Sequence, residues 1–472
     1  MNNKAITIMK NFSYTLSSNL ISMIISTLVI LIVPKLIGVE DYGYWQLYLF
    51  YSSYVGFLHF GWNDGIYLRY GGKEYSELNK RLFFSQFWML VIFQILVGFL
   101  IIIFSNLFST DTDRLFIIKM TTLCMLIVNI RLMLIYVLES TNRIKEYARI
   151  TLMEKVFYCC LILLFLLVGF REYKILITAD IIGKFITLGY AIYYCRDIVF
   201  NKISVFYFNI KETANNINVG IKLMFANIAS MFIIGVVRFG IERTWDVSTF
   251  GKVSLTLSIS NLLMLFINAV GIIMFPVLRR TNQERLPVIY STLRTFLMVP
   301  LLGILLVYYP LEVILSAWLP QYAESLKYMA LLFPMCIYEG KMVLLINTYL
   351  KTMRKEKLML SINVVSVLLS IFLTIIFTQI FMNLELIIVS IVILLAFRCI
   401  LAEILLSRML NVSVYKDIFL ELLLSIIFIL TGWFISSWYG IAIYCVIYAL
   451  YLLIKRRDIR VTLINVKHLV KR

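Results

Sequence analysis

Basic residues inside long apolar runs are the side chains of this sequence best placed to do chemistry. Seven such residues occur: Lys119, Arg131, Lys184, Arg238, Lys327, Lys341 and Arg398. An ion at the centre of a bilayer costs about 2.5–3.5 kcal/mol unless it is paired or faces water. The pattern therefore predicts either buried ion pairs or a hydrated, cationic cavity for an anionic ligand.

Spacing along a helix separates some of these residues from the rest. Lys119 and Lys327 lie close to the predicted ends of their runs, so their ammonium groups can reach the membrane surface. Asp180 and Lys184 are four residues apart. On a helix this spacing brings two side chains together, so the pair is expected to neutralise itself.

The remaining basic residues have weaker local partners. Glu403 follows Arg398 by five residues, a spacing that faces poorly, so a pair and a cavity position both stay open for Arg398. Glu339 and Lys341 are two apart and point to different faces of a helix. We predict these substrate-cavity cations: Arg131, Arg238, Lys341, Lys184 and Arg398.

Asp64, in the segment Trp62-Asn63-Asp64-Gly65, is the candidate site for a coupling ion, either H+ or Na+. The competing interpretation makes Asp64 a structural partner of a basic residue such as Arg69. Only two histidines are present, and no GxxxxGK phosphate loop occurs, so the sequence predicts no metal site, no catalytic residues, no nucleotide and no other cofactor.

The composition is that of an integral membrane protein. Apolar residues make up 61% of the chain, charged residues only 15%, and the mean hydropathy is +0.91. With about 20 residues for each crossing, the runs predict an all-α protein with about 14 transmembrane helices. Basic residues gather in alternate loops, so the net charge of +18 is explained by cytoplasmic loops and termini and not by nucleic-acid binding.

An internal repeat predicts that the chain has two homologous halves. Residues 19–43 and 227–251 align with an offset of 208 positions, and the shared positions include Tyr42 with Phe250. We therefore predict a six-helix lobe at 1–200, a cytoplasmic linker at 201–217, a second six-helix lobe at 218–410, and two additional helices with a basic cytoplasmic tail at 411–472. Removal of the residues after about 412 is expected to spare the core. Pro334 and Gly340 are candidate bending points.

Three short segments carry a resemblance to a known family. The turn Ile37-Gly38-Val39-Glu40-Asp41-Tyr42-Gly43 resembles the "LGxxxYG" turn of polysaccharide and oligosaccharide-lipid exporters. The segment Trp318-Leu319-Pro320-Gln321-Tyr322-Ala323 and the turns at 141–143 and 352–354 are similar to loops of the same family, the multidrug/oligosaccharidyl-lipid/polysaccharide superfamily. The resemblance implies a MATE-like fold of two pseudo-symmetric six-helix bundles around a central cavity.

The same resemblance implies a flippase for a polyprenyl-diphosphate-linked oligosaccharide repeat unit, of the O-antigen, capsule or exopolysaccharide type, in the bacterial cytoplasmic membrane. The partners it implies are the lipid-linked sugar, the bilayer, a polysaccharide polymerase and glycosyltransferases. Guanidinium groups would suit the diphosphate, because they bind phosphate oxygens in pairs. Alternatives are a multidrug antiporter of the same superfamily and, from a different class, a membrane-embedded glycosyltransferase or acyltransferase, for which no catalytic constellation is found.

Overall fold

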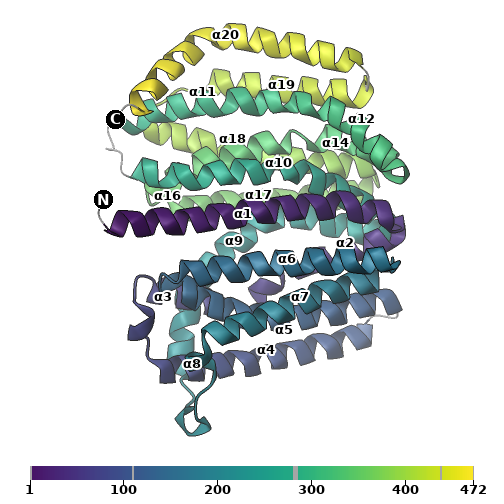
Figure 1. The fold of residues 1–472 in the computed structure, drawn as a ribbon. Coiled ribbons are helices and arrows are strands. Elements are labelled where there is room, and N and C mark those ends of the chain that lie inside the picture. Colours follow the sequence, from purple (N-terminus) through teal and green to yellow (C-terminus); the bar gives the residue numbers. More distant parts are fainter. Residues whose placement is uncertain (1–2, 109–110, 280–284, 436–437, 471–472) are drawn as a thin grey trace. The chain divides into compact units, whose positions relative to one another are not determined.

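The computed structural model describes residues 3–108, 111–279, 285–435 and 438–470, and these ranges contain helices and turns but no strand (Figure 1). Eleven helices in the described ranges are long and apolar enough to cross a membrane, and the apolar stretch Leu20–Leu36 is shorter. The predicted all-α, multi-pass membrane fold is confirmed. The chain divides into two compact units, Met1–Ile228 and Ala229–Arg472.

The described residues of the first unit form eight α-helices and the first half of a ninth. They are α1 (Asn3–Leu36), α2 (Val39–Ser52), α3 (Trp62–Tyr70), α4 (Lys80–Phe108), α5 (Thr112–Ser140), α6 (Ile144–Val168), α7 (Tyr173–Tyr194), α8 (Arg196–Val199) and α9 (Ile210–Thr244). Helix α6 packs on α1 and α7, and α5 packs on α4 and α7. The side chain of Asp111 caps α5 by accepting hydrogen bonds from the backbone N–H groups of Asp113 and Arg114.

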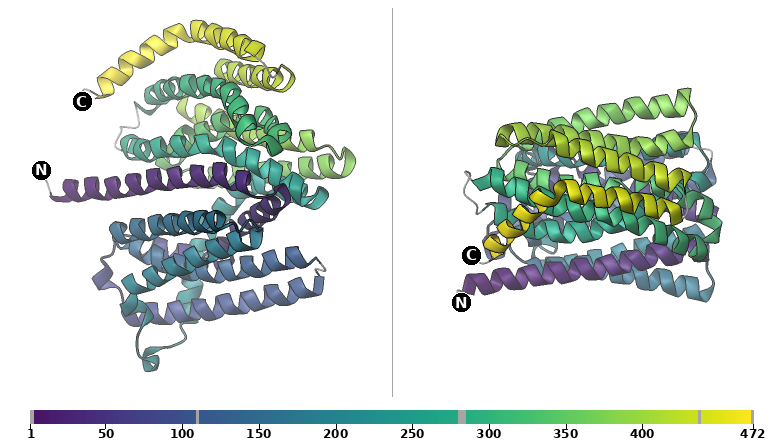
Figure 2. Two further views of the ribbon diagram at one scale, coloured as in Figure 1. Left: turned by 45° about the vertical axis from the view of Figure 1, so that its right-hand side comes forward. Right: turned by 90° about the horizontal axis from the view of Figure 1, so that it is seen from above.

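The second unit contains the rest of α9 and eleven further helices. They are α10 (Val247–Arg279), α11 (Leu286–Ile304), α12 (Tyr308–Trp318), α13 (Ala323–Leu326), α14 (Tyr328–Leu332), α15 (Met335–Lys341), α16 (Asn347–Thr352), α17 (Glu356–Ile375), α18 (Leu384–Leu410), α19 (Tyr415–Phe434) and α20 (Trp438–Val470). Helix α18 packs on α15 and α17, while α20 lies beside α11 and α19 (Figure 2).

The repeat seen in the sequence is also present in the helix boundaries. Helix α2 begins at Val39 and α10 at Val247, 208 positions apart. In each turn the aromatic residue of the repeat donates its backbone N–H to the carbonyl four residues earlier, at 2.9 Å for Tyr42 and 3.0 Å for Phe250. Both rings are buried. Conservation of these two rings between the halves therefore has a structural cause, because each one fills the packing beside its turn.

The second predicted crossing is broken, which its hydropathy did not show. After α2 the chain forms a 3-10 turn, Val55–His59, and then α3. Phe60 and Gly61 between them have positive φ angles of 53° and 81°. Glycine adopts this conformation at little cost, so Gly61 allows the helix to stop and restart within an apolar segment.

The tenth predicted crossing is segmented as well. Helix α14 ends at Leu332 and α15 begins at Met335, with Pro334 as its N-cap, so the predicted bend at Pro334 coincides with an interruption. Gly340 lies inside α15 with no interruption there, and a π-helical segment, Met342–Ile346, follows. Proline interrupts a helix because it lacks the N–H that the helix requires.

The observed helices differ from the predicted linker at 201–217 and from the predicted additional helices at 411–472. Helix α9 begins at Ile210, so the second half of the linker 201–217 is helical, and the boundary between the two units falls inside α9. Helices α19 and α20 belong to the same compact unit as α10–α18. The last two residues of the predicted basic tail lie outside the described residues.

Candidate functional site

Arg131 lies on α5 and is part of a buried ion pair. Its Nη2 atom is 2.9 Å from Oε2 of Glu154 on α6. Its Nη1 atom donates a 2.6 Å hydrogen bond to Oγ1 of Thr187 on α7. The guanidinium thus connects three helices of the first unit, and its charge is balanced by a carboxylate that spacing along one helix did not reveal.

Lys184 forms the local pair that its sequence spacing predicts. Its ammonium group contacts the carboxylate of Asp180 one turn earlier on α7. The hydroxyl of Tyr48 on α2 donates a 2.5 Å hydrogen bond to the same carboxylate. The prediction of a neutralised Asp180–Lys184 pair is confirmed, and this leaves Lys184 a weaker candidate for binding an anion.

Arg238 lies on α9 in the second unit. Its Nη2 atom donates a 3.1 Å hydrogen bond to Oγ of Ser254 on α10, and its guanidinium carbon is 5.4 Å from the centre of the Phe250 ring. The buried Glu242 follows Arg238 by four residues on α9. That spacing places a carboxylate on the same helix face, a relation that the sequence-based selection of Arg238 overlooked.

Arg398, on α18, pairs with Glu339 and not with Glu403, the partner considered from the sequence. Its Nη1 atom is 2.9 Å from Oε1 of Glu339 on α15. Its Nε atom donates to Oδ1 of Asn363 at 2.9 Å, and its Nη2 atom donates to Oγ of Ser230 at 3.0 Å. All three guanidinium nitrogens therefore have partners, which is typical of a packing role for a buried arginine.

Lys341 is 2% exposed and lies between two carboxylates. Its ammonium group contacts Glu403 on α18 and is 2.6 Å from Oε2 of Glu421 on α19. A lysine held by two carboxylates carries no free positive charge for a substrate.

Arg294 on α11 completes this group, which the sequence reasoning missed. Its Nε atom is 2.7 Å from Glu403, its Nη1 atom 3.0 Å from Asp417, and its Nη2 atom 2.8 Å from Glu421. Lys455 on α20 contacts Asp417 as well. We call these six residues the charge cluster: Arg294, Lys341, Lys455, Glu403, Asp417 and Glu421.

The six residues of the charge cluster carry three positive and three negative charges, and Lys455 also pairs with Asp458 at 2.8 Å. The charge cluster joins α11, α15, α18, α19 and α20 within the second unit. A signal for it was present in the sequence, because Glu403 and Glu421 are acidic residues inside apolar runs. Acidic residues in apolar runs indicate buried ion pairs as strongly as basic ones do, so Glu403 and Glu421 pointed to partners for the buried bases.

Asp64 is buried at the start of α3, beside the break in the second crossing. Its carboxylate oxygen is 3.6 Å from Nε2 of His59. The other ring nitrogen, Nδ1, accepts a 3.0 Å hydrogen bond from the backbone N–H of Gly61, so Nε2 carries the proton that points toward Asp64. Arg69 pairs with Glu212 on α9 at 2.6 Å, so the alternative partner named for Asp64 is engaged elsewhere.

Two buried asparagines lie near the break in the second crossing: Asn63, which precedes Asp64 in the chain, and Asn129 on α5. Asn63 donates its Nδ2 to the backbone oxygen of Asn129 on α5 at 3.0 Å, and Asn129 donates to Gln94 and to the backbone oxygen of Val55. These acceptors fix both amide orientations. Among the described residues neither Oδ1 atom has a hydrogen-bond partner. Amide and carboxylate oxygens are the ligands that hard cations prefer.

A very close helix crossing adjoins the same site. Gly61, the N-cap of α3, and Gly65 of α3 face Asn216 and Gly220 of α9 within the first unit. A Cβ atom on Gly220 would lie 2.0 Å from the Gly61 carbonyl oxygen, and one on Gly65 would lie 1.9 Å from the Asn216 carbonyl oxygen. Small residues four apart allow this approach of two backbones, as in other membrane proteins.

No cluster of three or more histidine, cysteine, aspartate or glutamate side chains suited to a metal occurs within the described ranges. The cysteines are all free, and five of the seven are buried. Asn63 and Asp64 place an amide oxygen and a carboxylate next to each other in the chain.

Comparison with known proteins connects the chain to a fold. No family model matches the sequence, and no curated protein matches it significantly. Among solved structures, the lipid II flippase MurJ in an inward closed conformation matches with a TM-score of 0.61 and 14% identity, over 93% of this chain and 98% of that one.

Two further matches have similar architecture. An inward-facing multidrug resistance MATE family transporter of the MOP superfamily matches with a TM-score of 0.60 and 11% identity, over 83% of this chain and 98% of that chain. A MOP superfamily transporter from Pyrococcus furiosus matches with a TM-score of 0.51 and 11% identity, over 85% and 96%. The chain therefore has the fold of MATE transporters and of the MurJ flippase.

Proposed function

We propose that this protein is a transporter that flips a polyprenyl-diphosphate-linked oligosaccharide from the inner to the outer leaflet of the bacterial cytoplasmic membrane by alternating access. The observation that carries the proposal is the likeness to the lipid II flippase, which extends over 93% of the chain. Surface polysaccharide synthesis, with a polymerase and glycosyltransferases as partners, is the process that such a cargo would serve.

Arg131 is the cavity cation that we assign first to the diphosphate. It pairs with a single carboxylate, Glu154, whose side chain retains 17% of its exposure. A guanidinium binds two phosphate oxygens through paired N–H donors, as it binds a carboxylate, so the diphosphate can compete with Glu154 for Arg131. Arg238 is the corresponding assignment in the second unit. Lys184, Lys341 and Arg398 hold their own partners more completely, so we place them behind Arg131 and Arg238 as candidate ligands of the diphosphate.

Asp64 is the residue that we assign to the coupling ion. It is buried, the neutral ring of His59 lies 3.6 Å away, and Oδ1 of the adjacent Asn63 has no hydrogen-bond partner among the described residues. Either a proton on the carboxylate or a sodium ion among the oxygens would relieve the cost of the buried charge. Binding of that ion would then bias one of the two access states.

A second candidate function is multidrug antiport, favoured by one specific observation. The MATE transporter has nearly the same TM-score as the flippase, and the buried carboxylate of Asp64 would attract a cationic drug. In this case the cargo would be positively charged and the paired arginines would be structural. The two functions therefore require opposite charges on the cargo.

The experiment that tests the proposal uses the full chain in proteoliposomes with a fluorescent polyprenyl-diphosphate oligosaccharide. A membrane-impermeant quencher reaches only the outer leaflet, so flipping is seen as quenching beyond the outer-leaflet fraction. Protein-free liposomes are the control. Quenching that stays at the outer-leaflet fraction, together with gradient-driven uptake of a cationic dye, would instead establish the antiporter.

A further inference from the structure

The segment 200–209, between α8 and α9 of the first unit, exposes large apolar side chains. It is the teal loop that extends below α8 in Figure 1. Ile203 is 86% exposed, Phe208 70% and Phe200 68%. Exposure of these side chains to water is unfavourable, and a group of this kind marks an interaction site.

Hydrogen bonds hold this segment along the first turns of α4. Nε1 of Trp88 donates to the Val199 carbonyl at 3.2 Å, and the N–H of Tyr207 donates to Oγ of Ser85 at 3.2 Å. Nε of Arg81 donates to the backbone of the segment at 3.3 Å. The apolar side chains are therefore presented outward by a fixed backbone.

The position along α4 indicates the depth of the segment in a membrane. Helix α4 has 29 residues, which gives a length of about 43 Å, against about 30 Å for the hydrocarbon of a bilayer. About 13 Å of the helix must therefore lie outside the hydrocarbon. The basic residues Lys80 and Arg81 favour a headgroup position for its first turns. Trp88 lies about two turns into the helix, where indole rings prefer the boundary between headgroups and hydrocarbon.

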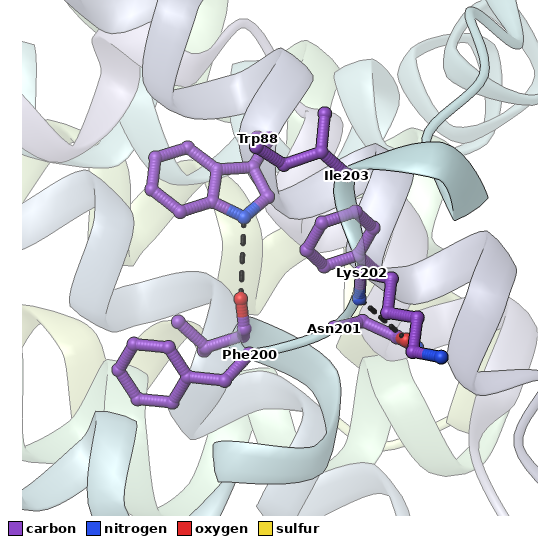
Figure 3. Close-up of a pocket in the computed structure, with 7 residues that line it drawn as sticks. Trp88, Phe200, Asn201, Lys202 and Ile203 are labelled. Atoms are coloured by element: carbon purple, nitrogen blue, oxygen red, sulfur yellow. Dashed lines mark hydrogen bonds between the residues drawn. The ribbon is translucent and has the colours of Figure 1, made fainter.

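A groove of about 560 Å³ separates the segment from α4 (Figure 3). Its lining residues are Phe84, Trp88, Val199, Phe200, Asn201, Lys202 and Ile203. Five of these seven are apolar, while Asn201 and Lys202 supply polar groups. Among the described residues the ammonium group of Lys202 has no ion-pair partner. The groove thus combines an apolar wall with one available positive charge.

The apolar wall of the groove continues into the outer face of α4. Trp88, Ile92, Ile95 and Phe99 are exposed and follow one another every three or four residues, which places them on one helix face. In a membrane helix such a face contacts lipid tails. The groove is therefore open to the same lipid that covers α4.

We propose that the segment 200–209 is an interfacial anchor and that its groove binds an anionic phospholipid. One acyl chain lies against Trp88 and Phe200, and the phosphate lies next to Lys202. The anchor holds the start of α9 at the membrane face where α4 begins. We expect this anchor whichever cargo the protein carries.

The depth of the segment is tested in the full chain, reconstituted in nanodiscs that contain phosphatidylglycerol. A nitroxide is placed by Ile203→Cys in a background with the exposed Cys160 and Cys445 changed to serine. Ser76→Cys in an exposed turn and Leu96→Cys on the lipid face of α4 are the references. The ratio of collisions with oxygen to collisions with a water-soluble nickel complex is expected to lie between the ratios at positions 96 and 76, as at the membrane interface. Nickel accessibility equal to that at position 76 would overturn the anchor.

The lipid site is tested by native mass spectrometry of lipids retained after detergent extraction. Lys202→Gln is compared with Lys357→Gln, an equal charge change at an exposed lysine of the second unit. Loss of Lys202 is expected to lower phosphatidylglycerol retention about five-fold, the factor typical of one basic residue at an anionic surface. Equal retention in the two variants would overturn the phospholipid assignment. Both side chains are exposed, so neither change should impair folding.

Discussion

The ammonium group of Lys341 on α15 lies 2.6 Å from Oε2 of Glu421 on α19. This contact joins the predicted second lobe to the helices predicted to lie outside it. The expectation that residues after about 412 are dispensable conflicts with it, because their removal takes Asp417 and Glu421 from the charge cluster. Lys341 and Arg294 would then share one remaining carboxylate, Glu403.

Truncation after residue 412 is therefore expected to abolish a stable fold of the second unit. Two buried cations with one carboxylate cannot both be compensated in a low-dielectric site. The measurement is size-exclusion chromatography of the detergent-solubilised protein, with truncation after residue 465 as the control that keeps the charge cluster. A truncated protein that elutes as a single sharp peak at full yield would disprove this expectation.

Glu421→Gln tests the charge cluster without removing any helix. Loss of one partner from a buried ion pair typically costs about 3–5 kcal/mol. We expect a comparable loss in the free energy of unfolding, measured by equilibrium denaturation in detergent. Glu356→Gln, at an exposed glutamate that begins α17, is the control and should have little effect. Equal stability of the two variants would show that the charge cluster is not important for folding.

The charge cluster also shows what could be read from the sequence. The pair Asp180–Lys184 was predicted because its members are one helical turn apart. Pairs such as Lys341–Glu421 and Arg398–Glu339 connect residues 80 and 59 positions apart, and these depend on which helices become neighbours. No local spacing encodes that.

The same distinction applies to the fold. The apolar runs and the Tyr42/Phe250 repeat were sufficient to predict an all-helical duplicated membrane protein, because both signals are local. Hydropathy did not show the break at Phe60 and Gly61, since average hydropathy is insensitive to backbone conformation. The reason for that break lies on another helix, where Gly220 packs against it.

Gly220→Ala is expected to destabilise the first unit by about 1–3 kcal/mol, the usual cost of overpacking. The new methyl group would clash with the Gly61 carbonyl, which is backbone and cannot rotate away. Gly189→Ala, on α7 with no atom within 4 Å of the new Cβ, is the matched control. It should be neutral or stabilise by about 0.5–1 kcal/mol. The measurement is the melting temperature of both variants in detergent. Equal melting temperatures would show that the crossing of α3 and α9 has room for the added methyl group.

Asp197, in α8 outside the spanning helices, should contribute to stability in a pH-dependent way. Partial burial opposes its ionisation, but hydrogen bonds from Tyr75 and Lys80 outweigh this and hold its pKa below the usual range. A lowered pKa in the folded state means that the contribution is present above the unfolded value and is lost as the pH falls through the folded value. The side chain is 45% exposed, so the effect is small, at most about 1 kcal/mol.

The test of this pH dependence is the difference in melting temperature between wild type and Asp197→Asn from pH 7 to pH 3. The difference should be constant at neutral pH, begin to decrease near the usual pKa of an aspartate, about 3.9, and vanish only below the lower pKa of the folded state. Glu77→Gln, in the turn that contains Tyr75, is the control. A difference that grows on acidification would reverse the assigned direction of the shift.

Asp64→Asn is expected to remove ion-driven transport while leaving the fold intact, because it keeps the size of the side chain and removes its charge. Transport is measured in proteoliposomes under a proton gradient and, separately, under a sodium gradient. The gradient that stimulates wild type but not the variant identifies the ion. Equal stimulation of both proteins would return Asp64 to a structural role beside His59.

Arg131 offers the sharpest test of cargo binding, because its single carboxylate partner can be neutralised with it. Arg131→Gln alone should lower both stability and flipping, since it leaves Glu154 buried without a partner. The double change Arg131→Gln with Glu154→Gln should restore the melting temperature, because no unpaired charge remains. If the guanidinium binds the diphosphate, the flipping rate of the double variant stays at least tenfold below that of wild type. This factor corresponds to the loss of one charged hydrogen bond, about 1.5–3 kcal/mol. A flipping rate that recovers together with the melting temperature would assign Arg131 to packing.

The three cations Arg131, Arg238 and Lys341 are also replaced one at a time. Normal flipping in all three variants would exclude these residues as cargo ligands.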